Sequence, residues 1–240
     1  DFPELIEHIL PFKERAKKRY DKGEFFWELR NCSYYDSFEK SKIVFPNLQS
    51  TNKFAFDETG AYINAPAVFL PTDDKYLTGI LNSKLIWYFL KNICVVRSGG
   101  YIEVKPQYFE QIPIPDISEK NKEALFDKTE KIMDLTRENQ NTDNKFKRLL
   151  SNHFSEIKIN KKLNKWFDLS FTDFKKELKK QKFKLTLDSE SEWLDYFENQ
   201  KEKYKDIVDR IQSFEKEIDQ KVYELYGLTD KEIRIVEASE

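Results

Sequence analysis

The sequence has few of the residues on which several common kinds of site depend. In 240 residues it contains two cysteines, Cys32 and Cys94, and two histidines, His8 and His153. Neither pair has the spacing of a zinc site, and two isolated thiols provide no disulfide framework, so a reducing compartment is expected. No apolar run approaches the ~20 residues that span a bilayer. These absences predict a cytoplasmic protein with no metal site and no membrane anchor.

Several catalytic motifs are missing as well. The chain has no glycine-rich nucleotide loop, no Ser-His-Asp arrangement and no histidine pair. It also lacks a cofactor-binding glycine motif and the Asn/Asp-Pro-Pro-aromatic motif with which amino-methyltransferases hold a flipped adenine. We therefore expect that this chain has no catalytic residues and binds no cofactor of its own.

What the sequence does have is charge, unevenly distributed. Charged residues make up 35% of the chain and aromatic residues 15%, yet the net charge is only −2. Residues 158–184 contain ten lysines and three acidic residues, a net charge of +7, whereas 188–240 carry −8. Such asymmetry is compatible with one face that meets a polyanion, and equally with a solvated surface.

The first half of the chain has an α+β pattern. Short apolar or alternating runs bounded by turn residues predict strands, and residues 75–90 have helical periodicity with an interruption at Asn82 and Ser83. Together they predict a twisted mixed sheet with packed helices over residues 23–116. The expected strands are Lys42–Phe45, Lys53–Phe56, Ala61–Asn64, Ala67–Leu70 and Ile93–Arg97.

The segment from Arg97 to Pro115 has the most distinctive composition. Gly99 and Gly100 can adopt positive φ and permit a close approach of the backbone to a partner. Residues 101–104 alternate as a short strand does, and Pro106 suits the first position of a helical turn. From these residues alone, an ordinary surface hairpin remains an alternative to a binding loop.

The second half predicts long helices. An apolar stripe begins after Ser118 and is expected to end or fray at the polar patch 139–144, and a heptad-like seam follows residue 187. One helix cannot bury such a seam alone, so we expect an antiparallel helical hairpin over 117–226 with the basic segment at its tip. A homodimeric coiled coil is the main rival. Residues 227–240 predict a short C-terminal helix, opened by a capping box at Thr229.

Four segments, in order, resemble a known family. The run Arg-Ser-Gly-Gly-Tyr-Ile-Glu-Val-Lys-Pro-Gln-Tyr-Phe-Glu-Gln-Ile-Pro-Ile-Pro at 97–115 is similar to part of the TaqI-like C-terminal specificity domain. That domain is the target-recognition module of restriction-modification DNA methyltransferases, and a related ending occurs in type I specificity subunits. The segments Phe26–Tyr35, Lys42–Pro46 and Ile218–Leu228 resemble its opening, first core strand and closing helix.

The resemblance implies a function and a parent protein. It implies recognition of a short sequence in double-stranded DNA for an adenine-specific methyltransferase, with or without type II restriction endonuclease activity. The methyltransferase domain would lie upstream of residue 1, and residues 1–22 would be a linker helix from it. The absence of an initiator methionine agrees with a fragment. S-adenosylmethionine, together with Mg²⁺ if the parent also cleaves DNA, would belong to the parent enzyme.

Candidate DNA-binding residues follow from these patterns. Arginine presents paired donors that suit guanine, so Arg30 and Arg97 are the first candidates for base contacts, with Tyr101 and Gln107 beside them. Lys42 and Lys105 are candidates for phosphate contacts. The set is completed by three loop residues and four lysines of the basic segment: Ser98, Gly99, Gly100, Lys175, Lys176, Lys179 and Lys180. Trp27 and Tyr34 are alternatively core aromatics.

Two other functions remain open at this stage. Asp73 or Asp74 with Glu103 and Lys105 could mimic the Asp…Glu-x-Lys site of a Mg²⁺-dependent nuclease, although Glu-x-Lys arises often by chance in a chain so rich in charge. Alternatively, the hairpin could be a protein-interaction module that makes no contact with DNA. Binding that weakens steeply with salt would favour DNA recognition over such a module.

Overall fold

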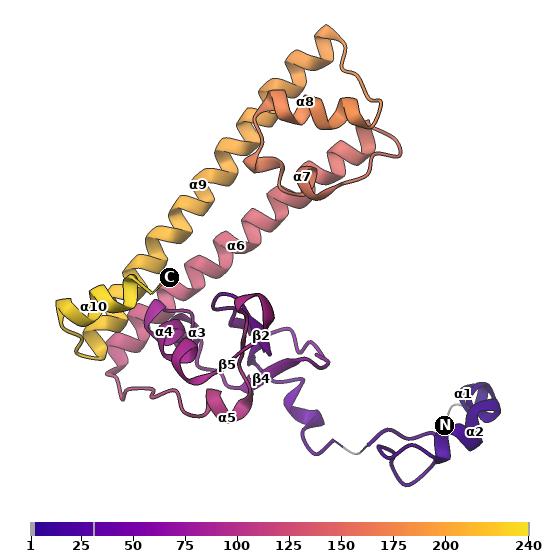
Figure 1. Ribbon diagram of the computed structural model, residues 1–240, viewed down its shortest axis with the longest axis vertical. Coiled ribbons are helices and arrows are strands. Elements are labelled where there is room, and N and C mark those ends of the chain that lie inside the picture. The colour runs from indigo at the N-terminus through magenta and orange to yellow at the C-terminus, as the bar shows by residue number, and fades with distance from the viewer. Residues whose placement is uncertain (1–2, 31, 240) are drawn as a thin grey trace.

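The computed structural model describes residues 3–30 and 32–239. Figure 1 shows a small α+β body, a long helical hairpin that rises from it, and an N-terminal segment that extends away from both. Within that segment, α1 (Pro3–Ile9) and α2 (Lys13–Lys17) flank a 3-10 turn, η1 (Leu10–Phe12), which contains Pro11. A helix in two parts around this proline is what the sequence predicts, since proline lacks the N–H that an α-helix needs.

The body contains two small sheets rather than one mixed sheet. The first has the order β3 (Ala55–Asp57), β1 (Lys42–Pro46), β4 (Ala67–Pro71), and the second has the order β2 (Leu48–Gln49), β6 (Ile102–Glu103), β5 (Val95–Val96). Every strand pair among the described residues is antiparallel. The predicted α+β class is confirmed, whereas the prediction of a mixed sheet is wrong.

Individual strands differ from the predictions. Strands β3 and β5 have other bounds than the predicted Lys53–Phe56 and Ile93–Arg97, and two further differences concern whether a strand exists. Residues 61–64, predicted as a strand, form none; Asp57 turns the chain just before them, accepting a hydrogen bond from the Ala61 N–H at 3.1 Å. Strand β2 was not predicted, because two residues carry no periodicity. It pairs with β6 through Leu48 and Gln49, and the backbone N–H of Val104 donates to the Asn47 carbonyl at 2.7 Å.

Helices cover the sheets and close the core of the body. Helix α3 (Tyr76–Leu81) and helix α4 (Lys84–Ile93) are separated at Asn82 and Ser83, as predicted. Ser83 is the N-cap of α4, and its hydroxyl oxygen accepts a hydrogen bond from the Ile86 N–H at 3.4 Å. The apolar faces of both helices pack on β1, β3 and β6, in a core that also contains residues of the hairpin, Leu125, Ile218 and Val222.

The hairpin consists of α6 (Glu119–His153) and α9 (Leu187–Leu225), which run antiparallel side by side (Figure 1). Three contacts fix their register: Lys128 pairs with Glu217, Lys203 with Glu138, and the Phe146 ring stacks on Tyr196. At ~1.5 Å per residue, α6 is about 52 Å long and α9 about 58 Å long. The seam of α9 thus packs against α6 within the same chain, with Ile207 and Ile218 buried, while homodimerisation stays a prediction.

The polar patch of α6 does not end the helix, contrary to the prediction. Thr142 is buried in it, and Asp143 accepts hydrogen bonds from the Trp166 indole N–H at 3.0 Å and from Lys147 at 2.7 Å. Polar side chains weaken an isolated helix because they compete for backbone groups. Here they are occupied by partners in the tertiary structure, so the helix continues to His153.

A second core closes the far end of the hairpin. Helix α7 (Lys161–Asn164), the turn η4 (Trp166–Asp168) and helix α8 (Phe171–Lys180) fold over the ends of α6 and α9. The fully buried Trp166 stacks on Phe146 with a ring distance of 3.8 Å. Beyond α9, the short helix α10 (Asp230–Glu237) begins with the predicted capping box of Thr229 and Glu232. No helix among the described residues combines the length and hydrophobicity needed to cross a membrane.

Candidate nucleic-acid interface

Residues 97–101 form an exposed loop between β5 and β6, which we call the hairpin loop. Strand β6 and then Lys105 follow it in the chain. The Arg97 N–H donates to the Tyr101 carbonyl at 2.6 Å and closes the turn. Gly99 and Gly100 have φ of 80° and 77°, the left-handed region that glycine adopts without strain. All five residues of the loop, from Arg97 to Tyr101, are exposed. The predicted glycine hinge is therefore present in the structure.

Charge in this loop is arranged around Glu103. The Arg97 guanidinium donates to Glu103 Oε2 from both Nε, at 2.8 Å, and Nη2, while Lys105 Nζ lies 3.3 Å from Oε1. The hydrogen bond from Arg97, followed by that from Lys105, lowers the pKa of Glu103 against the opposing effect of burial. The carboxylate thus holds two cations on the same surface and orients them.

The Arg97 guanidinium still has hydrogen-bond donors with which it can bind an external partner. Its side chain is 51% exposed, and within the part of the chain that the structure describes Nη1 has no hydrogen-bond acceptor. Because Glu103 already holds one edge of the guanidinium, the other edge can bind a base with little further loss of side-chain entropy. Tyr101 and Gln107 are exposed beside it, the latter in the helical turn α5 (Pro106–Phe109) that Pro106 begins as predicted.

The predicted site residues nearer the N-terminus lie in exposed surroundings. Arg30 is exposed, and Asn31, which belongs to the segment resembling the family's opening, lies outside the described residues. Trp27 is 39% exposed and stacks on Phe25, and Tyr34 is 55% exposed. The alternative that these two aromatics belong to the core is therefore wrong.

The structure corrects the prediction made for Lys42. Its side chain is fully buried, and Nζ donates to Asp57 Oδ2 at 2.6 Å and to the Phe38 carbonyl at 2.7 Å. An ammonium enclosed in this way cannot reach a phosphate, so the prediction of a phosphate contact at Lys42 is wrong. The apolar strand pattern around it identified β1 but gave no sign that the lysine points inward.

The Lys42–Asp57 pair predicts a pH dependence of stability. Burial raises the pKa of Asp57, but hydrogen bonds from Lys42, Thr59 and the Ala61 backbone outweigh it and lower the pKa from 3.8 to about 2. Because the folded-state pKa is depressed, this stabilisation is complete above the unfolded-state value and is lost as the pH falls from about 4 to about 2. A shift of this size corresponds to about 2 kcal/mol.

Urea unfolding between pH 2 and pH 6 measures this contribution. In the double variant Lys42→Met, Asp57→Asn, the acid-dependent part of the free energy of unfolding should shrink by about 2 kcal/mol. A wild-type protein and a double variant with the same pH profile would contradict the assignment.

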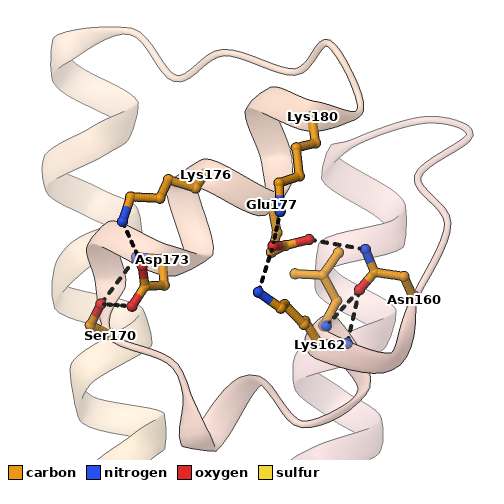
Figure 2. Close-up of polar contacts among 8 residues, drawn as sticks. Asn160, Lys162, Ser170, Asp173, Lys176, Glu177 and Lys180 are labelled. Carbon is orange, nitrogen blue, oxygen red and sulfur yellow. Dashed lines mark hydrogen bonds and ion pairs between the residues drawn. The ribbon is translucent and has the colours of Figure 1, made fainter.

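Some lysines at the tip of the hairpin are paired with a carboxylate, and others have no ion pair among the described residues. Figure 2 shows Lys176 directed at Asp173, with 2.8 Å between Nζ and Oδ1, and Lys180 directed at the buried Glu177, at 2.7 Å. Glu177 also accepts a hydrogen bond from Asn160 at 3.2 Å and lies 3.6 Å from Lys162 Nζ. The hydrogen bond from Lys180 lowers the pKa of Glu177, and that from Lys176 lowers the pKa of Asp173.

Other tip lysines are better placed to meet a phosphate. Lys175 pairs with Glu190, but Lys179 is exposed and has no ion pair among the residues described. Lys182 and Lys184, just after α8, are exposed in the same way and were not selected individually from the sequence. The lysine-rich segment 158–184 is the sequence feature that points to these two residues. Near α8, Lys175, Lys176, Lys179 and Lys184 line a hollow of about 370 Å³.

The residues proposed for a Mg²⁺-dependent nuclease are in different surroundings. Glu103 lies between two cations on β6, whereas Asp74 precedes α3, where its backbone N–H donates to Thr72 Oγ1 at 3.1 Å and its charge acts on Tyr76. Over the described ranges, no three histidine, cysteine, aspartate or glutamate side chains are grouped so as to hold a metal ion. A carboxylate already neutralised by Arg97 and Lys105 is a weak metal ligand, so this geometry gives the nuclease no support.

Comparison with known proteins assigns the two halves of the chain separately. Residues 118–222, most of the hairpin, match a domain family of unknown function, DUF8810. No curated protein matches the chain. Residues 8–114 match the model of the TaqI-like C-terminal specificity domain, a stretch that contains the body and the hairpin loop. This match confirms the family inferred from the sequence: residues 8–114 are similar to the TaqI-like C-terminal specificity domains.

Proposed function

We propose that this chain recognises a short sequence in double-stranded DNA and directs an adenine-specific methyltransferase to it. The family match over residues 8–114 supports DNA target recognition in a restriction-modification setting. The observation that carries the proposal to particular residues is the exposed hairpin loop, where Glu103 orients Arg97 and Lys105 on one surface. Arg97 is the candidate reader of a guanine, and Lys105 of a neighbouring phosphate.

The chemistry of the reaction belongs, in this proposal, to the parent enzyme. The catalytic domain and S-adenosylmethionine would be supplied upstream in the parent protein, with Mg²⁺ if that protein also cleaves DNA. The residues of this chain bind and orient: the loop selects bases, and lysines such as Lys105 and Lys179 hold the backbone. The location that fits this function is the cytoplasm.

Selection from a random duplex library tests this function. The chain, alone or joined to its methyltransferase domain, is incubated with duplexes that contain a randomised central region, and the bound fraction is sequenced over successive rounds. We expect one short defined sequence to be enriched. Recovery of no common sequence, with binding that is uniform across duplexes, would contradict target recognition.

The assignment of chemistry to another domain has its own control. The purified chain should transfer no methyl group from labelled S-adenosylmethionine and should cleave no plasmid in the presence of Mg²⁺. Plasmid cleavage that persists in a carefully purified sample, and that disappears in the variant Glu103→Gln, would instead favour the nuclease arrangement.

A further inference from the structure

A groove between the body and the hairpin extends the candidate DNA surface. Its cavity volume is about 910 Å³. One wall is the segment 50–56 with the junction of α3 and α4, and the other is formed by the halves of α6 and α9 nearest the body. The groove therefore joins the specificity domain to the part of the chain that matches a family of unknown function.

The groove begins beside the hairpin loop. In the sheet of β2, β6 and β5, Leu48 pairs with Glu103 and Gln49 with Ile102. Because the two strands are antiparallel, continuing this register by one residue places Ser50, the first residue of the groove wall, opposite Tyr101, the last residue of the loop. A strand of DNA whose bases meet the loop thus has a direct continuation into the groove.

The charge of the groove suits a polyanion. Four cationic side chains line it: Lys53 and Lys84 on the body, and Arg137 and Lys216 on the hairpin. Two carboxylates oppose them, but Asp219 is buried and accepts a hydrogen bond from the Lys84 N–H at 2.8 Å. Glu215 is then the exposed acidic residue of the lining, next in sequence to Lys216.

A buried hydroxyl in the groove lacks a partner. Thr129 and Thr136 donate to the carbonyls four residues before them in α6, at 2.8 and 2.7 Å. Thr78 is 4% exposed, and among the described residues its Oγ1 makes no such bond. Such an unpaired buried hydroxyl is costly, but its oxygen is enclosed by the protein, so the proposal below rests on the charge and the position of the groove.

From these features we propose that the groove holds the sugar–phosphate backbone of one DNA strand next to the recognised bases, with Arg137 and Lys216 in contact with phosphates. The inference rests on the proposed function and assigns a role to the hairpin, which forms one wall of the DNA-binding surface. A groove of about 910 Å³ admits a few backbone units of one strand and not a whole duplex.

Residues of opposite charge lie side by side in the groove, so their substitutions should change the affinity for DNA in opposite directions. In the full chain, Lys216→Gln should weaken binding to a mixed-sequence 24-base-pair duplex and reduce the magnitude of the salt slope by about 0.9. Arg137→Gln should act in the same direction with a smaller loss of slope, because Arg137 already pairs with Asp134 at 3.1 Å. Glu215→Gln should tighten binding severalfold, because it removes a carboxylate that repels phosphate. Lys205→Gln, an exposed position of α9 outside the groove, is the matched control and should leave the slope unchanged.

Fluorescence anisotropy between 50 and 200 mM salt gives the slopes, and thermal melting confirms that each variant is folded. The proposal stands if both cationic variants lose slope relative to Lys205→Gln and Glu215→Gln binds more tightly. It is overturned if the three groove variants behave like the control. In that event a specificity change in Arg97→Ala would still uphold target recognition, whereas a wild-type chain that binds no DNA would overturn both.

Discussion

Arg97→Ala is expected to lower affinity for the recognised duplex by about 5- to 150-fold, the equivalent of a bidentate base contact of about 1–3 kcal/mol. Affinity for a scrambled duplex should change little, because phosphate contacts dominate non-specific binding. The Arg97 side chain is 51% exposed and is held by Glu103, so it can reach a base edge from an oriented position. Competition titrations with the selected and scrambled duplexes measure the ratio.

Arg210→Ala is the matched control for this variant. Arg210 is also exposed and also pairs with a carboxylate, Asp206, at 3.8 Å, but it lies on α9 and away from the loop. The same charge is removed, and the specificity ratio should be unchanged. If Arg97→Ala weakens both duplexes equally, the loop is not the reader, and Arg30 becomes the next residue to test.

Glu103 connects this expectation to the loop's internal order. Glu103→Gln removes the charge that holds Arg97 and Lys105, so both side chains must be ordered on binding, at a cost of about 0.5–1.5 kcal/mol for each. The loss of the carboxylate also relieves repulsion of the phosphates. A specificity ratio that falls while overall affinity is kept would show that orientation, and not net charge, is what Glu103 contributes.

Local rules predicted most of the secondary structure because the signals were local. Pro11 and Pro106 placed helix boundaries, Asn82 and Ser83 separated α3 from α4, and Thr229 opened α10. The glycines of the hairpin loop predicted positive φ, which the structure shows. In each case the residue's own backbone preference decides the geometry, and distant residues add little.

The failures come from contacts between distant residues. Asp143 in α6 disfavours a helix by its own preference, but it accepts hydrogen bonds from Lys147 and from the indole of Trp166, 23 residues away, and the helix continues through it. Lys42 is buried because Asp57 lies opposite it in the register of β1 and β3. Sequence patterns do not contain such pairings, so the candidate set included one lysine that the fold encloses.

The tip of the hairpin should contribute affinity that depends on the length of the DNA. Lys179, Lys182 and Lys184 are exposed on or just after α8, about 30 Å beyond the body, counted from Met133 to Phe154 at ~1.5 Å per residue. Replacing all three with glutamine should weaken binding to every sequence alike and reduce the magnitude of the salt slope by up to about 2.7, or about 0.9 for each contact.

That effect requires a duplex that reaches the tip. Because base pairs are spaced by ~3.4 Å, a duplex that follows the hairpin must extend at least about 9 base pairs beyond the body. The triple variant should therefore match wild type on a 12-base-pair duplex and lose slope on one of 30 base pairs. Lys176→Gln with Lys180→Gln is the internal comparison, since Asp173 and Glu177 already neutralise these lysines and the loss of slope should be smaller. Equal slopes for the triple variant and wild type on the long duplex would show that DNA does not run along the hairpin to its tip.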